Sequence, residues 1–265
     1  MNSDVRLLQI SDPHLFASPQ GALRGVPTLA SLRAVLRHAL QRDTYDAVLV
    51  TGDIVHDEPG GYRHFRVAML ETGLPVYCVP GNHDVPAALP AAVAGTRVQV
   101  GGHVDLGRWR IVLLDSSVPG QAHGRLPSAE LERLATALAE ADGRHVLIGV
   151  HHHPVPHDSR WLDSVGLHNA AELFAVTDRH PSVRAIIWGH VHQVYDMLRK
   201  GVRLLGVPST CAQFLPRSEQ FAIDPAPPGY RTLTLRADGS IETEVVRLDA
   251  VATATAAAAR AAAGA

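Results

Sequence analysis

The sequence predicts an α/β fold in which buried strands alternate with helices. Six short runs rich in Val, Ile and Leu occur at residues 5–10, 47–50, 76–79, 111–114, 146–150 and 185–188. These runs lack the polar alternation of a half-exposed strand, which indicates strands covered on both faces. Longer segments with a helical pattern lie between them, at about residues 28–41, 61–71, 129–141 and 169–178. This alternation is typical of layered α/β domains.

Individual elements carry further signals. The third helix has Ser128 as a plausible N-cap, Glu130 in its first turn and Gly143 just past its end. After Gly201, residues 202–207, 230–235 and 241–248 are predicted to be meandering strands, the last two joined by a turn at 237–240. We interpret residues 1–249 as a single domain, with substrate or lid loops at about 155–168 and at the proline-rich segment 213–229. The Ala-rich residues 250–265 are predicted to be a frayed or disordered tail without a catalytic role.

Composition narrows the class of protein. The formal net charge is −2 and Lys200 is the single lysine, which argues against a protein that binds a nucleic acid polymer. Cys78 and Cys211 stand in apolar stretches and are predicted to be free, buried thiols. No basic and apolar leader opens the sequence and no apolar run approaches ~20 residues, so a cytoplasmic protein without a membrane span is expected.

Polar residues suited to metal binding follow five of the six predicted strands. The clusters are Ser11-Asp12-Pro13-His14, Thr51-Gly52-Asp53, Pro80-Gly81-Asn82-His83-Asp84, His151-His152-His153-Pro154 and Gly189-His190-Val191-His192. Ligands of open α/β sheets bind outside the carboxyl ends of the strands, so all five clusters are expected at one edge. With 16 histidines in the chain, one His-x-His pair is expected by chance, whereas five such clusters after five strands are not.

The residue types fit a dinuclear metal centre. Two divalent ions can clamp a phosphoryl group and generate hydroxide near neutral pH. Such a centre needs a bridging carboxylate, together with imidazoles and an amide oxygen that bind metal without adding negative charge. Mixed nitrogen and oxygen donors suit Mn, Fe, Zn or Co, and the lack of a thiolate cluster disfavours a structural zinc site.

These motifs, in this order, resemble the calcineurin-like metallophosphoesterase superfamily over roughly residues 5–210. Within it, the sequence is similar to the class III cyclic-nucleotide phosphodiesterases, bacterial enzymes that hydrolyse 3′,5′-cyclic AMP. The segments that carry this closer similarity are the His-His-Pro run, residues 159–163 with Asn169 after them, Pro208-Ser209-Thr210-Cys211 and Pro228-Gly229-Tyr230-Arg231. Serine/threonine phosphatases of the superfamily more typically carry Glu at the position of Asp84, which disfavours that branch.

The resemblance implies a four-layer αββα sandwich and hydrolysis of cyclic AMP to AMP by a hydroxide activated at two metals. It implies one metal held by Asp12, His14, Asp53 and His192, and another held by Asp53, Asn82, His151 and His190. His83 would donate a hydrogen bond or proton to the phosphate or leaving oxygen, and Asp84 would orient His83. The substrate would meet His14, Asp53, Asn82, His83, His192, His152 and Arg160. Fe or Mn would be the metals, with Zn or Co as alternatives.

Several alternatives stay open at this point. Relatives commonly have two His before two Pro, so either His151 or His153 could be the ligand, and we favour His151. Asp115 is expected to finish a turn, and His56, His64, His103, His123, His145 and His180 to be surface or loop residues. The same metals would serve a broader phosphodiesterase acting on glycerophosphodiesters or 2′,3′-cyclic nucleotides. A non-catalytic binding module is disfavoured because every ligand position is filled. The resemblance also allows a homodimer.

Overall fold

Two six-stranded sheets form the centre of the computed structural model, which describes residues 4–248. The tail predicted at 250–265 lies outside the described residues. The first sheet has the order β16 (Ile241–Arg247), β15 (Gly229–Leu235), β1 (Val5–Ile10), β4 (Ala47–Val50), β5 (Val76–Cys78) and β6 (Val98–Val100). The second has the order β11 (Tyr195–Arg199), β12 (Val202–Gly206), β10 (Val183–Trp188), β9 (His145–Gly149), β8 (Trp109–Leu113) and β7 (Gly102–Leu106).

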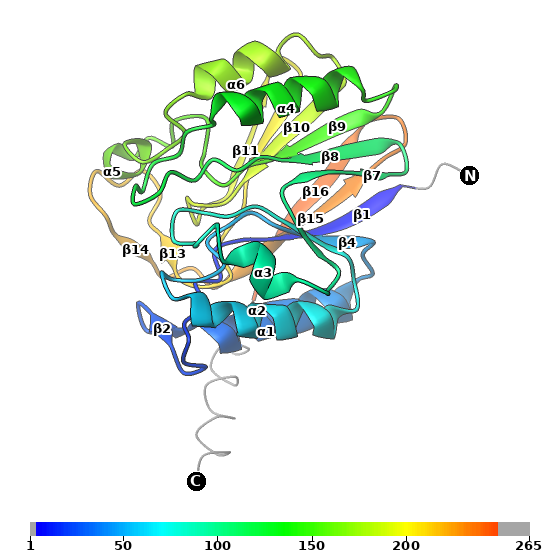
Figure 1. The fold of residues 1–265 in the computed structure, drawn as a ribbon. Helices are drawn as coiled ribbons and strands as arrows, with labels where there is room; N and C mark the ends of the chain where they lie inside the picture. Colours follow the sequence, from blue (N-terminus) through cyan, green and yellow to red (C-terminus); the bar gives the residue numbers. More distant parts are fainter. Residues whose placement is uncertain (1–3, 249–265) are drawn as a thin grey trace.

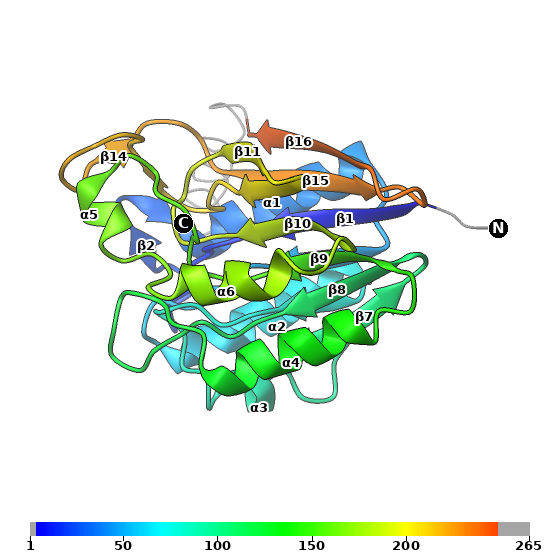
Figure 2. The ribbon, with the colours of Figure 1, turned by 90° about the horizontal axis from the view of Figure 1, so that it is seen from above.

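Helices cover the outer face of each sheet (Figures 1 and 2). The first sheet is covered by α1 (Thr28–Arg42), α2 (Tyr62–Thr72), which follows the 3₁₀ turn η1 (Pro59–Gly61), and α3 (Leu89–Val93). The second is covered by α4 (Ser128–Ala139) and α6 (Ala170–Thr177), while the short α5 (Arg160–Asp163) lies at the end of the sandwich. The architecture is therefore the four-layer αββα sandwich.

Alternate residues of each strand face opposite sides of its sheet: one side packs against the helices, and the other packs in the layer between the two sheets. On β1, Leu8 and Ile10 face the helices, whereas Val5 and Leu7 join the layer between the two sheets. Because both faces of the central strands are buried, their sequences are rich in Val, Ile and Leu and lack regular polar alternation, which is why the sequence pattern identified them. Trp109 fills the layer between the sheets without exposure to solvent.

Parallel pairing brings the carboxyl ends of the central strands to one edge. Strands β1, β4, β5 and β6 pair in parallel, as do β8, β9, β10 and β12, and antiparallel strands flank each set. The loops after the strands then hydrogen bond to one another. The amide of Asp12 donates to the carbonyl of Gly52 at 3.0 Å, and that of Gly189 donates to the carbonyl of His151 at 3.2 Å.

Four features of the strands differ from the sequence-based expectation. The run at 202–207 does not form a meander with the last two strands, because β12 joins the second sheet whereas β15 and β16 join the first. Strands β6, β7 and β11 were not expected. The segment 213–229 contains the strand pair β13 (Gln213–Phe214) and β14 (Ile223–Asp224), and the hairpin β2 (Ala22–Leu23) and β3 (Val26–Pro27) was also missed.

The cysteines agree with the expectation of free, buried thiols, whereas Ser128 is the first residue of α4 and the N-cap is Pro127. Cys78 and Cys211 are both free and buried. Along residues 4–248, no helix has the length and apolar character needed to cross a bilayer.

Candidate metal centre

The polar clusters that follow β1, β4, β5, β9 and β10 meet at one edge of the sandwich. Ligand-type atoms of Asp12, His14 and His192 lie within 4.8 Å of one another, and so do those of Asp12, Asp53 and His151. Asp12, Asp53, His14, His151 and His192 are all buried, so these polar groups are held away from bulk water. Four segments far apart in the sequence therefore supply one compact set of metal-type donors.

Most of these loops have strained backbone at the polar residue itself. The φ angles of Asp12, His14, Asp53, His190 and His192 are 53°, 46°, 50°, 64° and 51°, respectively. Few residues other than glycine adopt this left-handed region, and such residues cluster at functional sites, where the surrounding structure holds them. This conformation turns the backbone sharply at the end of each of these strands. The side chains of these residues then point toward the edge that the strand ends share.

The first proposed metal position lies between Asp12, His14 and His192. The Nε2 atoms of His14 and His192 are 3.2 Å apart, and Nε2 of His192 is 3.4 Å from a carboxylate oxygen of Asp12. Oδ2 of Asp53 is 3.7 Å from Nε2 of His14. Two imidazole nitrogens and two carboxylates therefore converge on this position.

The second proposed metal position lies between Asn82, His151 and His190. Nε2 of His151 is 3.2 Å from the Asn82 amide oxygen and 3.2 Å from Nδ1 of His190. Oδ1 of Asp53 is 3.5 Å from this same Nε2 of His151. The two oxygens of Asp53 thus face different donor sets, so this carboxylate is placed to contact both proposed metal positions.

The hydrogen bonds on the far side of the rings fit metal binding. Nδ1 of His151 lies 2.6 Å from the carbonyl oxygen of Thr51, and Nδ1 of His192 lies 2.7 Å from that of Ala212. A carbonyl only accepts, so each Nδ1 carries a proton, and Nε2 is the atom that would bind a metal after losing any proton it carries. His190 instead faces the second position with Nδ1, and its Nε2 is buried without a hydrogen-bond partner among the described residues. The donor set therefore fits two metal ions.

Electrostatics favour cations at this edge. Burial lowers the pKa values of His14 and His190 well below the ordinary value for histidine, so both rings are neutral. Burial also lowers the pKa of His151, but the Asp53 carboxylate outweighs it and raises that pKa to about 9. Within residues 4–248, the ion-pair partners of Asp12 and Asp53 are imidazoles rather than lysine or arginine. The buried carboxylates thus draw positive charge into the site.

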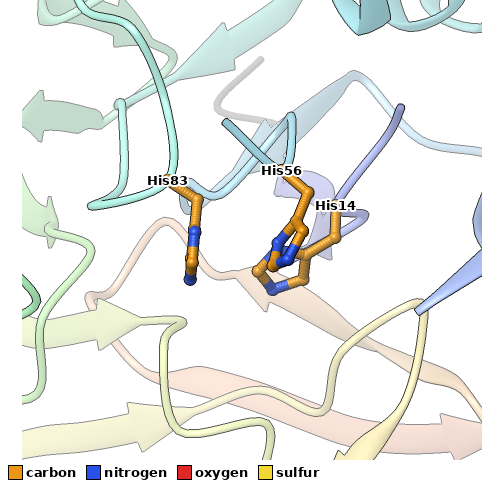
Figure 3. Close-up of side chains that lie close together, drawn as sticks. All are labelled: His14, His56 and His83. Carbon is orange, nitrogen blue, oxygen red and sulfur yellow. The ribbon is translucent and has the colours of Figure 1, made fainter. Parts of the chain in front are cut away.

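His83 lies beside the first position, but Asp84 does not orient it as expected. Figure 3 shows the rings of His14, His56 and His83 close together, and the rings of His83 and His56 are 4.5 Å apart. Nδ1 of His83 is 3.2 Å from the carboxylate of Asp57. Asp84 instead points into the protein, because its carboxylate accepts hydrogen bonds from buried backbone. The residue that positions the His83 ring is therefore Asp57.

The buried Asp84 carboxylate organises the loop that follows Asp53. It accepts from the backbone N–H groups of Ile54, Val55 and Gly81 at 3.0, 3.1 and 2.8 Å, and from the hydroxyl of Tyr62 at 3.0 Å. Burial raises the pKa of Asp84 to about 6 in spite of these donors. Asp84 thus ties the loop after β4 to the loop after β5, which carries Asn82.

Replacement of Asp84 by Asn is expected to lower the free energy of unfolding by about 2–4 kcal/mol, because the new amide leaves buried N–H and O–H donors unpaired. The Asp57→Asn variant should instead keep wild-type stability, since the Asp57 carboxylate is 69% exposed. It should lose turnover, because Asp57 positions the His83 ring. Urea unfolding and steady-state kinetics would measure both quantities. An Asp84→Asn variant of normal stability and impaired turnover would restore the original assignment of Asp84.

The three consecutive histidines have different environments. His151 faces Asp53 and Asn82, as described above. His153 lies 3.9 Å from Asp163 and packs against His157, outside the donor groups that could hold a metal. The geometry therefore favours His151 as the ligand. His152 is fully buried, its Nδ1 is 2.8 Å from the hydroxyl of Ser116, and it does not line the cavity over the donor set, contrary to the expectation from the sequence.

A cavity of about 390 Å³ opens over the donor set. His14, Asp53, Asn82, His83, His190 and His192 line it together with His56, Leu23, Arg24, Ala122, Trp161, Leu162, Val165, Phe214 and Phe221. Arg160 was expected to touch the substrate, yet its side chain is 85% exposed and pairs with Glu219. The reason is that α5 turns Trp161 and Leu162 toward the cavity and Arg160 away from it.

Sequence reasoning missed five residues of this site. His56 is expected from the sequence to be a surface or loop residue, but its Nδ1 is 3.2 Å from Nδ1 of His14. The others are Asp57, Arg24, Phe214 and Phe221. The sequence offered a signal for four of them, since His56 and Asp57 follow Gly52-Asp53 on the same loop, and Phe214 and Phe221 lie in the segment 213–229 that was predicted to be a substrate or lid loop.

Comparison with known proteins gives consistent matches. Residues 5–194 match the family described as calcineurin-like phosphoesterase. The chain is 42% identical to the 3′,5′-cyclic adenosine monophosphate phosphodiesterase CpdA of Escherichia coli K12, covering 92% of this chain and 90% of that protein. It is 41% identical to the CpdA of Pseudomonas aeruginosa, covering 94% and 92% of the two chains.

Solved structures share the fold at low sequence identity. A dimetal phosphatase from Danio rerio superposes with a TM-score of 0.63 at 18% identity, covering 92% of this chain and 99% of that one. The TT1561 protein of Thermus thermophilus gives a TM-score of 0.61 at 16% identity, covering 92% and 100%. The sandwich implied by the sequence resemblance is thus confirmed. Together with the family match and the identities above, this shows that the chain belongs to the calcineurin-like phosphoesterase family.

Proposed function

We propose that this chain hydrolyses 3′,5′-cyclic AMP to AMP at a dinuclear metal centre. The observation that carries the proposal is 42% identity, over 92% of the chain, to a cyclic AMP phosphodiesterase. The site supports it independently, because seven metal-type donors and His83 surround one cavity or lie directly behind its wall. A full donor set weighs against a binding module that has lost its chemistry.

Two groups of residues would hold the metals. Asp12, His14 and His192 would hold one ion, Asn82, His151 and His190 the other, and Asp53 would contact both. Metals bound there would supply charge neutralisation for the phosphate and a nucleophile formed from water near neutral pH. Fe or Mn fits the mixed nitrogen and oxygen donors, with Zn or Co next. The backbone carbonyls of Thr51 and Ala212 would keep two of the imidazoles in the correct tautomer.

His83 would act on the leaving group. Its side chain is 33% exposed in the cavity, and Asp57 binds Nδ1, which leaves Nε2 free to face a substrate. Hydrolysis of the ester bond expels a ribose alkoxide, a strong base that needs a proton as the P–O bond breaks. Donation from Nε2 of His83 would meet that need, and the Asp57 carboxylate would stabilise the protonated ring.

A substrate panel tests the proposal. Protein loaded with Mn²⁺ should hydrolyse cyclic AMP much faster than 2′,3′-cyclic AMP or glycerophosphoethanolamine. Cyclic GMP differs from cyclic AMP only in its base, so its rate measures the preference for adenine. Chelation with EDTA should abolish turnover, and added Mn²⁺ should restore it, because the nucleophile depends on bound metal. If cyclic AMP were the poorest substrate by orders of magnitude, a broader phosphodiesterase would replace the proposal. The single-domain assignment of residues 1–249, the cytoplasmic location and a homodimer stay predictions.

A further inference from the structure

Three aromatic rings form a continuous wall of the cavity over the metal centre. Trp161 comes from α5, and Phe214 and Phe221 come from the β13–β14 segment, which Figures 1 and 2 show beside α5. The three ring centroids are 5.2–5.3 Å apart and each pair meets edge to face, at 70–79°. Such pairs hold a preferred geometry, so the rings form a defined surface.

The aromatic wall begins at a proposed metal ligand and ends at solvent. Phe214 stacks on the imidazole of His192 with the ring centroids 3.9 Å apart and the planes 8° from parallel. Phe221, at the other end, is 43% exposed. A substrate whose phosphate lay at the metal centre would thus have its remaining part directed along these rings.

Arg24 lies over the exposed ring of this wall. Its guanidinium carbon is 5.0 Å from the ring centroid of Phe221, so the two side chains join the β2–β3 hairpin to the β13–β14 segment across the cavity. Arg24 and Gly25 form the two-residue turn of that hairpin, with φ angles of 52° and 81°. Within the described residues, Arg24 has no carboxylate partner, unlike Arg160 on the neighbouring α5. No ion pair among the described residues therefore holds its guanidinium on the ring of Phe221.

We propose that Trp161, Phe214, Phe221 and Arg24 form the subsite for the purine base of the substrate, with the base stacked on Phe221. This assignment rests on the proposed function, because it places a nucleotide at the metal centre. The planar guanidinium already occupies a ring face that a planar base fits. Entry of the base would lift Arg24 from Phe221 and leave the guanidinium stacked on the outer face of the base.

The alternative is a structural role, in which the three rings only pack α5 against the β13–β14 segment. The two interpretations differ in one measurable quantity, the contribution of the base to affinity. AMP and ribose 5-phosphate share the phosphate and the sugar and differ in the base. Their affinity ratio therefore isolates the base subsite, and neither compound requires turnover to be measured.

Isothermal titration calorimetry of the Mn²⁺-loaded protein should show that AMP binds more tightly than ribose 5-phosphate. The Phe221→Ala variant should reduce this ratio by about 5- to 100-fold, the range for loss of one base–aromatic stack. Phe221→Tyr should retain the ratio because it keeps the ring. Leu215→Ala is the matched control, since Leu215 is an equally exposed apolar residue between the same two strands but does not line the cavity.

Two outcomes would overturn the subsite. Equal affinity of the wild-type protein for AMP and ribose 5-phosphate would show that no base is bound. An equal loss of affinity for AMP and for ribose 5-phosphate in Phe221→Ala would show that the rings only pack against one another and do not bind the base. Failure of the proposed function has a different signature, because a base-dependent affinity ratio that falls in Phe221→Ala, without cyclic AMP hydrolysis, would retain the subsite and reject the reaction.

Discussion

Replacement of Asp53 by Asn is expected to remove most of the bound metal and to lower kcat/KM for cyclic AMP by about a thousandfold or more. The two carboxylate oxygens of Asp53 face His151 on one side and His14 on the other, at 3.5 and 3.7 Å. The asparagine amide has one acceptor oxygen, so it could serve only one of the two positions. Metal-ion catalysis is worth several kcal/mol, and about 1.4 kcal/mol corresponds to a tenfold change in rate.

Metal analysis of the purified Asp53→Asn variant by inductively coupled plasma mass spectrometry would measure this loss directly. Thermal unfolding provides a second measurement, because an ion that binds the native state stabilises it to an extent that grows with its affinity. Added Mn²⁺ should therefore raise the Tm of the wild-type protein and raise that of the variant much less.

Asp115→Asn provides a matched control for the loss of a carboxylate. Asp115 follows β8 at the same end of the second sheet, but its carboxylate accepts from the backbone N–H and the hydroxyl of Ser117, as expected for a turn residue. Metal content and turnover should be close to wild type in this variant. An Asp53→Asn protein that bound two metals normally and kept its activity would contradict the bridging role of Asp53.

The sequence was sufficient to bring the metal donors together, because their placement depends on regular structure. Parallel strands end at one edge, and buried strands are recognisable from apolar runs such as Ala47–Val50. The direction in which individual side chains point was harder to predict from the sequence. Asp84 turned away from His83 because Ile54, Val55 and Gly81 supply buried N–H groups that need an acceptor. No sequence pattern indicates which buried N–H groups will lack an acceptor in the folded protein.

Other features were hidden because their signals are short or ambiguous. The β2–β3 hairpin that presents Arg24 has strands of two residues each, too short for an alternating pattern. The run at 202–207 has the same apolar character in either sheet, and only the pairing of β12 with β10 and β11 decides between them. Phe214 and Phe221 lie at opposite ends of the irregular loop that connects β13 to β14. Their contact with Trp161 therefore depends on tertiary structure alone.

Replacement of His83 by Ala is expected to lower kcat/KM for cyclic AMP by about 10²- to 10⁴-fold, the usual contribution of a general acid. Metal content should stay at the wild-type level, because His83 is not among the residues proposed to hold the ions. The exposed His103 on β7 gives a matched control, and His103→Ala should leave both quantities unchanged.

The leaving group separates proton donation by His83 from a purely electrostatic contact with the phosphate. Cyclic AMP expels a ribose alkoxide, which needs a proton, whereas bis(p-nitrophenyl) phosphate expels p-nitrophenolate, a far weaker base that departs without one. If Nε2 of His83 donates the proton, His83→Ala should lower kcat/KM for the nitrophenyl diester by less than about tenfold, because a good leaving group gains little from general acid catalysis. Equal losses with both substrates would instead assign His83 to binding the phosphate, since that contact is common to the two diesters.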